Sequence, residues 1–115
     1  MTDATHGSFV WYDLLTGNPR DAVAFYTDVI GWASQPLGSA YTMFTGSDGP
    51  LCGTTELPEP SRTMGAPPHW TSNVLVDDVD AAVAEARKLG GSVLGEPSSS
   101  DAGRLAVLAD PQGAH

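Results

Sequence analysis

Hydrophobic and polar positions along the first third of the chain follow two different periods. Residues 9–16 are mainly aromatic and aliphatic, and this run predicts a strand. The apolar positions after it recur at spacings of three and four residues, which predicts a helix with one apolar stripe. That stripe consists of Ala22, Phe25, Tyr26, Val29 and Ile30. We expect Asn18 to cap this helix ahead of Pro19, and Gly31 to end it.

Short apolar runs separated by glycine-containing turns follow this helix. Three strands are expected, at residues 32–37, 41–45 and 51–57. The turns between them lie at residues 38–39 and 46–49. The first half of the chain therefore predicts the order strand, helix, strand, strand, strand, written βαβββ below.

The same order begins again after a proline-rich linker. Residues 58–68 hold four of the nine prolines and show no apolar period, and residues 69–76 then predict a strand. We expect Asp78 to cap a second helix, which Gly90 and Gly91 end. The apolar stripe of this helix consists of Val79, Ala82, Val83, Ala86 and Leu89.

The last part of the chain predicts a shorter version of the first half. Strands are expected at residues 92–95 and 104–109, and we interpret the serine-rich segment 96–103 between them as a mobile loop. Residues 110–113, Asp-Pro-Gln-Gly, form a turn sequence, and only two residues follow it. The second half is therefore one strand short. That strand is either absent from this chain or supplied by a neighbouring chain.

Residues 13–31 and 73–91 read as two copies of one segment. Their identities in register are Leu15/Leu75, Ala22/Ala82, Val23/Val83, Ala24/Ala84 and Gly31/Gly91. A period of sixty residues is too long for a solenoid repeat and too short for two independent domains. The natural solution is one domain made of two similar halves.

We therefore expect a single domain over residues 1–115, with a first module at 8–57, a linker at 58–68 and a second module at 69–115. The fold class is α+β. Two βαβββ modules form a curved mixed sheet around a cleft, with the helices outside and the final strand missing. Paired halves of this kind enclose a cleft, which is where small molecules usually bind.

Composition narrows the possible partners. The chain has 14 acidic and 5 basic residues, for a net charge of −9, and the bases are scattered, which argues against nucleic-acid binding. No apolar run approaches the ~20 residues of a membrane span. The first residues lack the pattern of a secretory signal. The single cysteine, Cys52, excludes an internal disulfide, so we expect a protein of the reducing cytoplasm.

The two matched strands each predict one apolar and one mixed face. Their even positions are mainly apolar and should meet the helices: Val10, Tyr12, Leu14, Thr16, Trp70, Ser72, Val74 and Val76. Their odd positions mix aromatic, acidic, imidazole, hydroxyl and amide groups: Phe9, Trp11, Asp13, Leu15, His69, Thr71, Asn73 and Leu75. A mixed face indicates either a wet pocket or a solvent-exposed surface. The apolar members Trp11, Phe9 and Leu15 favour the pocket.

Several motifs, in this order, resemble those of the vicinal oxygen chelate superfamily, the group of glyoxalases, bleomycin-resistance proteins and extradiol dioxygenases. They are FVWYDLLT, FYTDVIGW, HW followed by VDDVDAAVAEARKLGG, and LADPQG. The first strand is most similar to glyoxalase-like proteins of actinobacterial type. The resemblance covers nearly the whole chain. It implies the paired-module fold and a homodimer, although one fold can serve many chemistries.

The resemblance also implies a divalent metal held by His, Gln or Glu from four strands. Here the first ligand position falls on Trp11, whose indole nitrogen only donates, and the second-half position falls on Thr71, whose neutral hydroxyl is a poor ligand. Glu56 matches the first-half glutamate, and His69 lies two residues before Thr71. The last ligand would come from the missing strand. A stable site usually needs at least three protein ligands, so we expect no metal cofactor; any bound divalent ion would use Glu56 and His69.

Three functions follow as hypotheses. The first is a metal-independent protein that sequesters a planar or cationic small molecule in an aromatic-walled cleft, as in the bleomycin-resistance branch. The second is a divalent-metal lyase, isomerase or dioxygenase acting on a vicinal-oxygen substrate. The third is an accessory module of a larger assembly. The ligand-binding candidates are Trp11, Asp13, Glu56, His69, Thr71 and Asn73.

Each candidate also has a plain structural reading. Trp11 can form an aromatic wall or simply fill a core. Asp13 can pair with a ligand cation, with Arg104 or with water near the strand end. Asp13 and Asn73 can each orient a ligand or satisfy nearby backbone groups. His69 can act with Glu56 in acid–base chemistry, or it can merely begin a strand.

Overall fold

The computed structural model describes residues 5–100 and 103–115 of the chain. By their contacts these residues divide into two compact units. The sheet unit is Val10–Asn73, and the hairpin unit comprises Val74 onward together with the described residues up to Phe9. Each unit is described by itself below.

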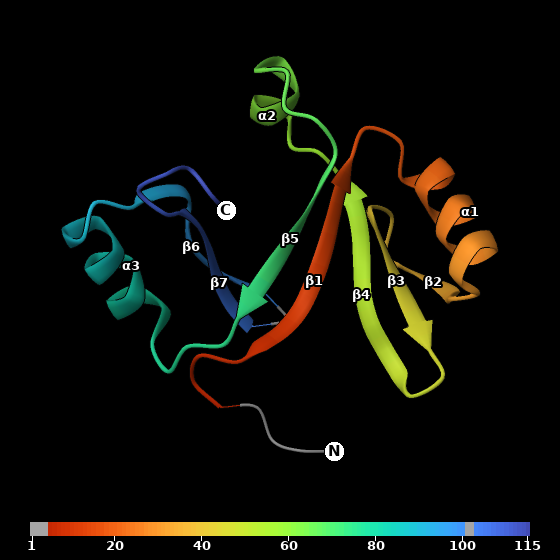
Figure 1. The fold of residues 1–115 in the computed structure, drawn as a ribbon, viewed down its shortest axis with the longest axis horizontal. Helices are drawn as coiled ribbons and strands as arrows, with labels where there is room; N and C mark the ends of the chain where they lie inside the picture. The colour runs from red at the N-terminus through yellow and green to blue at the C-terminus, as the bar shows by residue number, and fades with distance from the viewer. Residues whose placement is uncertain (1–4, 101–102) are drawn as a thin grey trace. The chain divides into compact units, whose positions relative to one another are not determined.

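The sheet unit is built on five strands in the order β2-β3-β4-β1-β5, in which β1 and β4 pair in parallel and β2, β3 and β4 pair antiparallel. Figure 1 shows β1 between β4 and β5. The strands are β1 (Phe9–Thr16), β2 (Ala33–Leu37), β3 (Tyr41–Gly46), β4 (Gly49–Glu56) and β5 (His69–Val74). All five predicted strands are therefore confirmed, and β1 has the predicted bounds.

Helix α1 (Pro19–Ile30) begins and ends where the sequence predicts. The Asn18 side chain accepts a hydrogen bond from the backbone N–H of Asp21 at 3.1 Å, and Pro19 occupies the first turn. Gly31 has φ 87°, the left-handed conformation that only glycine adopts without strain. These local signals fix the helix ends without help from the rest of the fold.

The core of the sheet unit lies where α1 packs on the sheet. Phe44 is fully buried, with its ring 6.1 Å from that of Tyr26 on α1 and 5.3 Å from that of Trp32. Beside it Leu14 and Thr54 are buried, and the Thr54 hydroxyl donates to the Leu14 carbonyl oxygen at 3.0 Å. The part of the sheet beneath α1 is therefore a buried, mainly aromatic and aliphatic layer.

We expected the helices to cover the even-numbered positions of β1 and β5. Only part of this set is buried. Leu14 and Thr16 are buried, but Val10, Tyr12 and Val74 remain 41%, 46% and 46% exposed. Within the sheet unit α1 contacts β4 and β2, so the outer parts of β1 and β5 extend beyond it. The expectation that helices cover the whole set is therefore wrong at these positions.

The predicted linker contains a short helix, α2 (Glu59–Thr63). Its first turn closes through a hydrogen bond from the Arg62 N–H to the Pro58 carbonyl oxygen at 3.1 Å. The sequence analysis did not predict this helix, because residues 58–68 show no apolar period.

The hairpin unit consists of helix α3 (Val79–Lys88) and the antiparallel strands β6 (Ser92–Ser100) and β7 (Gly103–Ala109). As predicted, Asp78 caps α3, accepting from the Ala81 N–H at 3.0 Å. Gly90, with φ 94°, follows the last turn. Figure 1 shows α3 beside this hairpin.

The serine-rich segment is a strand over most of its length, so its interpretation as a loop is wrong for residues 96–100. β6 continues to Ser100 because β7 supplies its partners, with Ser98 opposite Leu105 and Ser99 opposite Arg104. Two register shifts near Gly95 and Pro97 accommodate the irregular residues. Residues 101–102 of the predicted loop lie outside the described residues.

The turn predicted at residues 110–113 is present. Its Asp110 carboxylate accepts from the backbone N–H groups of Gln112 and Ala114, each at 2.9 Å. Among the described residues, two strands follow α3 where three follow α1, and the sheet is not closed. Across the same residues no helix is long and apolar enough to span a membrane.

Candidate functional site

A chain of hydrogen bonds crosses one face of the five-stranded sheet. The Trp11 indole N–H donates to the Tyr41 hydroxyl oxygen at 2.8 Å, and the Tyr41 hydroxyl donates to Asp13 Oδ1 at 2.6 Å. The Asn73 amide donates to Asp13 Oδ2 at 3.1 Å. These four residues, here called the Asp13 network, come from β1, β3 and β5 and are all partly buried. The face that carries them is called the network face.

A glycine makes this network possible. Gly53 on β4 is the register partner of Asp13 on β1 and of Met43 on β3. A β-carbon at Gly53 would stand 1.9 Å from the Tyr41 hydroxyl oxygen and 2.1 Å from its Cζ. The Tyr41 ring therefore lies directly over Gly53, and so its hydroxyl reaches from β3 across β4 to β1.

Tyr41 keeps its proton at neutral pH. Burial, reinforced by the hydrogen bond to Asp13, raises the pKa of Tyr41 well above its usual range. Burial and the nearby Asp13 charge also raise the pKa of the Cys52 thiol. Tyr41 therefore remains a hydroxyl donor to Asp13, and the carboxylate is oriented by two neutral donors.

Two further predicted residues lie on β5 beside the network. The Thr71 hydroxyl donates to the Asp13 backbone carbonyl oxygen at 3.3 Å. His69 is on the same face of β5 by alternation, and its Nδ1 is 2.9 Å from the Pro67 carbonyl oxygen. Of the six residues proposed from the sequence, the structure brings Trp11, Asp13, Thr71 and Asn73 together, with His69 at the start of the same strand.

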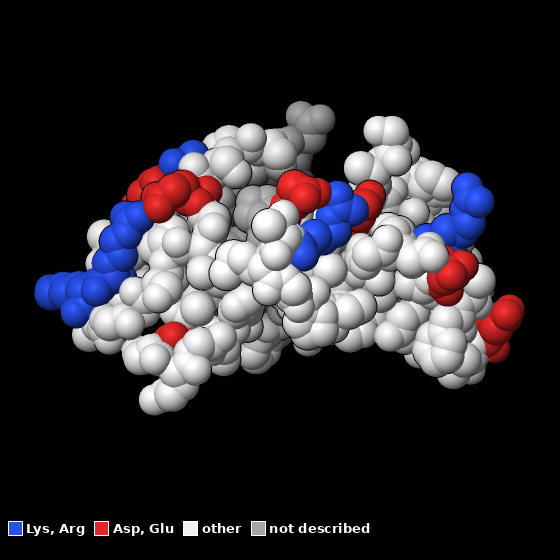
Figure 2. Space-filling model, turned by 90° about the horizontal axis from the view of Figure 1, so that it is seen from above, with Lys and Arg blue, Asp and Glu red and all other residues white. Residues whose placement is uncertain are grey.

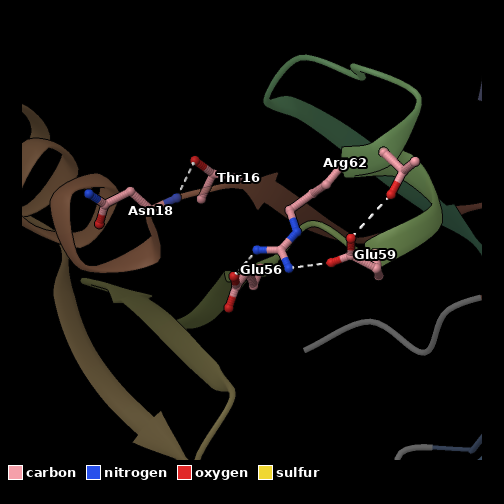
Figure 3. A network of polar contacts seen from close by, with 6 residues as sticks. Thr16, Asn18, Glu56, Glu59 and Arg62 are labelled. Carbon is pink, nitrogen blue, oxygen red and sulfur yellow. Dashed lines mark hydrogen bonds and ion pairs between the residues drawn. The ribbon is translucent and has the colours of Figure 1, made fainter.

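Glu56 lies apart from this group. It is the register partner of Thr16, which belongs to the helix-facing side, whereas Asp13 opposes Gly53 on the network face. Figure 3 shows the Glu56 carboxylate against the Arg62 guanidinium, which also bonds Glu59 at 2.5 Å. The paired carboxylates, Glu59 foremost, raise the pKa of Arg62, and Arg62 in turn lowers that of Glu59. Glu56 is therefore held by Arg62 on the helix-facing side, whereas His69 lies on the network face by alternation.

The described residues do not fit the divalent metal that the superfamily implies. Trp11 and Thr71, at two expected ligand positions, direct their hydrogens at Tyr41 and at a backbone carbonyl. Glu56, at a third position, is held in an ion pair by Arg62. Nowhere in residues 5–100 and 103–115 do three or more His, Cys, Asp or Glu side chains gather in a way that could hold a metal ion.

Sequence reasoning missed Tyr41. A signal for it was nevertheless present, because the hairpin turn at residues 46–49 sets the pairing of β3 with β4 and so places Tyr41 diagonally across from Gly53. An aromatic residue covering a strand glycine is a known means of stabilising a sheet. What the pattern does not show is that the hydroxyl reaches a third strand.

Comparisons with known proteins relate this chain to one protein family. The sequence model of the family described as "Glyoxalase-like domain" matches residues 10–115. The chain is 36% identical over 110 residues to "Putative glyoxylase CFP32" of Mycobacterium tuberculosis, covering 90% of this chain and 42% of that protein. It is 38% identical over 111 residues to "Anthracycline biosynthesis protein DauV" of Streptomyces sp. strain C5, covering 94% and 39%.

The chain thus spans about two-fifths of the length of these curated relatives. Among solved structures, methylmalonyl-CoA epimerase of Streptomyces coelicolor superposes with a TM-score of 0.56 at 21% identity, covering 90% of this chain and 88% of that chain. At that identity the likeness supports the fold alone.

Proposed function

This chain belongs to the family of glyoxalase-like domains, and from that premise we propose that it binds a planar small molecule without a metal ion. The ligand lies on the network face of the sheet unit. The observation that carries the proposal is that Trp11 and Thr71 occupy two expected metal-ligand positions and both make hydrogen bonds of their own. The face offers an aromatic ring and oriented polar groups in place of a metal.

Trp11 supplies the aromatic wall in this proposal. Its indole N–H is bonded to Tyr41, which fixes the orientation of the ring before any ligand arrives. A ring fixed in this way loses little conformational entropy when a planar molecule stacks on it. Asp13 and Asn73 then provide acceptor and donor groups at the edge of the stacked ligand.

The relatives support a planar ligand. One is named an anthracycline biosynthesis protein, and anthracyclines are planar fused-ring molecules. An anthracycline is therefore a suitable probe, because its own fluorescence reports binding. The probe tests the class of ligand and does not identify a natural one.

The test is a fluorescence titration of an anthracycline with the purified chain in excess EDTA. We expect saturable binding, at least tenfold weaker for Trp11→Ala and close to wild type for Trp11→Phe, which keeps an aromatic ring. Trp70→Ala is the matched control, because Trp70 lies on the helix-facing side and bonds Tyr26. Unchanged binding by a folded Trp11→Ala protein would show that the aromatic wall is wrong.

The second candidate is a divalent-metal lyase, isomerase or dioxygenase, favoured by the glyoxylase name of CFP32. It requires Glu56 to leave Arg62 and to share an ion with His69. Retention of Ni²⁺, Zn²⁺, Fe²⁺ or Mn²⁺ near one per chain, lost in Glu56→Ala and His69→Ala, would favour this function over the first.

Homodimerisation is part of the same proposal and is carried over from the superfamily resemblance. In the sheet unit β2 and β5 are the edge strands, and an open edge favours pairing with another chain. Light scattering on the purified chain should give twice the 12.0 kDa of one chain. A mass of one chain at high protein concentration would contradict the dimer.

A further inference from the structure

Asp13 combines partial burial with a charge that no cation in the described part of the chain balances. Its carboxylate oxygens accept from the Tyr41 hydroxyl at 2.6 Å and from the Asn73 amide at 3.1 Å, both neutral donors. The ion pairs found among residues 5–100 and 103–115 all involve other carboxylates. Removing a carboxylate from water costs free energy, and an opposite charge close to it offsets that cost.

Neither basic side chain of the sheet unit is placed to pair with Asp13. Its two are Arg20 and Arg62. Arg62 bonds both Glu56 and Glu59, as Figure 3 shows. Arg20 stands in the first turn of α1, which packs on the opposite side of the sheet. His69 is the titratable group on β5, and by strand rise it lies about 7 Å along the strand from Thr71, whose hydroxyl contacts the Asp13 backbone.

Several more exposed acidic residues are paired with arginine. Glu56, Glu59, Asp80 and Glu96 each lie within ion-pair distance of an arginine. On the face of the molecule seen in Figure 2, basic groups lie next to acidic ones. A nearby cation would stabilise the Asp13 carboxylate more than it stabilises these residues, because Asp13 is less exposed to water. Both side-chain contacts of its carboxylate are nevertheless with neutral donors.

The neutral donors also leave the carboxylate ready to bind. Tyr41 and Asn73 each engage one oxygen, and a carboxylate has about four acceptor positions in all. Gly53, the register partner of Asp13 on β4, has no side chain, and the Tyr41 ring occupies the space beside it. The result is an anion fixed in orientation with acceptor capacity unused, the arrangement that suits an ammonium group.

We propose that the ligand of the network face carries a protonated amine that binds Asp13, with Tyr41 and Asn73 as the residues that position the carboxylate. This inference rests on the proposed function above, because it assigns a chemical class to the ligand of the same face. It goes beyond that function in requiring a positive charge. It predicts that a planar neutral molecule binds much more weakly than its cationic counterpart.

The test compares two probes on the wild-type chain: an anthracycline with a free amino sugar, and the same anthracycline acetylated on that amine. Both keep the planar ring system and its fluorescence, and only the first carries a cation. We expect the amine to bind at least tenfold more tightly, equal to about 1.4 kcal/mol. Because this comparison needs no variant, a folding defect cannot obscure it.

Asp13→Asn then locates the effect. The preference for the amine should disappear in this variant, while Asp28→Asn, which removes one exposed charge from α1, should keep it. Equal binding of both probes to wild type would overturn the amine inference and leave the proposed function standing. A preference that survives Asp13→Asn would place the cation elsewhere and overturn it too. Failure of both probes to bind would overturn the proposed function and this inference together.

Discussion

The Tyr41 ring occupies the space that a side chain at Gly53 would need. A β-carbon there would stand 1.9 Å from the Tyr41 hydroxyl oxygen and 2.6 Å from its Cε1. The absence of a side chain on β4 thus lets a residue of β3 orient the Asp13 carboxylate on β1. The site depends on a residue that contributes no functional group of its own.

Gly53→Ala should therefore displace Tyr41 and destabilise the protein by about 1–3 kcal/mol, the usual cost of overpacking. The cost should shrink in a Tyr41→Ala background, because the two residues share one space. Denaturant unfolding of the four proteins measures this coupling. Gly17→Ala is the matched control, since its β-carbon would meet nothing within 4 Å. Equal stability of Gly53→Ala and wild type would contradict the described position of Tyr41.

Stability should decrease at alkaline pH through Tyr41. Its pKa is raised in the folded state from an ordinary value of 10.0, so the folded protein favours the protonated form. Such a group contributes its full stability below pH ~10, and the contribution is lost as pH rises towards the folded-state pKa.

Denaturant midpoints measured from pH 8 upward should therefore fall more steeply for wild type than for Tyr41→Phe, which has no proton to lose. The difference in phenolate absorbance between the two folded proteins reports the ionisation of Tyr41 directly. A Tyr41 that ionises near pH 10 in the folded protein would refute the hydrogen bond to Asp13 as described.

The cap of α3 can be tested with a pair of neighbouring aspartates. Asp78→Ala removes the acceptor for the Ala81 N–H and should cost about 1 kcal/mol. Asp77→Ala removes the same charge from a side chain that is 87% exposed and makes no such cap, so its effect should stay within ~0.5 kcal/mol. Thermal unfolding of the two variants distinguishes them, and equal losses would mean that charge and not capping is responsible.

The sequence predicted those parts of the fold that depend on local chemistry. Asn18 and Asp78 cap their helices, and Gly31 ends the first, because each acts on backbone groups a few residues away. The strand at Ser98–Ser100 was missed for the opposite reason. Serines have little strand preference of their own, and pairing with β7 decides their conformation.

The candidate site shows the same difference between residues fixed by local pattern and residues placed by strand pairing. Alternation alone placed Trp11, Asp13 and Asn73 on one face, and the hydrogen bonds among them confirm that arrangement. Tyr41 could not be assigned to the site from its own strand, because its role requires β3, β4 and β1 to be aligned in register. Glu56 was proposed by resemblance, and the register that pairs it with Thr16 places it on the helix-facing side, away from the network face.

The central claim is that the network face binds its ligand without a metal, and one titration tests it most directly. Binding of the amine-bearing anthracycline is measured first on protein stripped with EDTA and then after Ni²⁺, Zn²⁺, Fe²⁺ or Mn²⁺ is added back. The account predicts the same dissociation constant in every case, weakened by Asp13→Asn and unaffected by Glu56→Ala. Binding that is absent in EDTA, restored by one of these metals and lost in Glu56→Ala would contradict it.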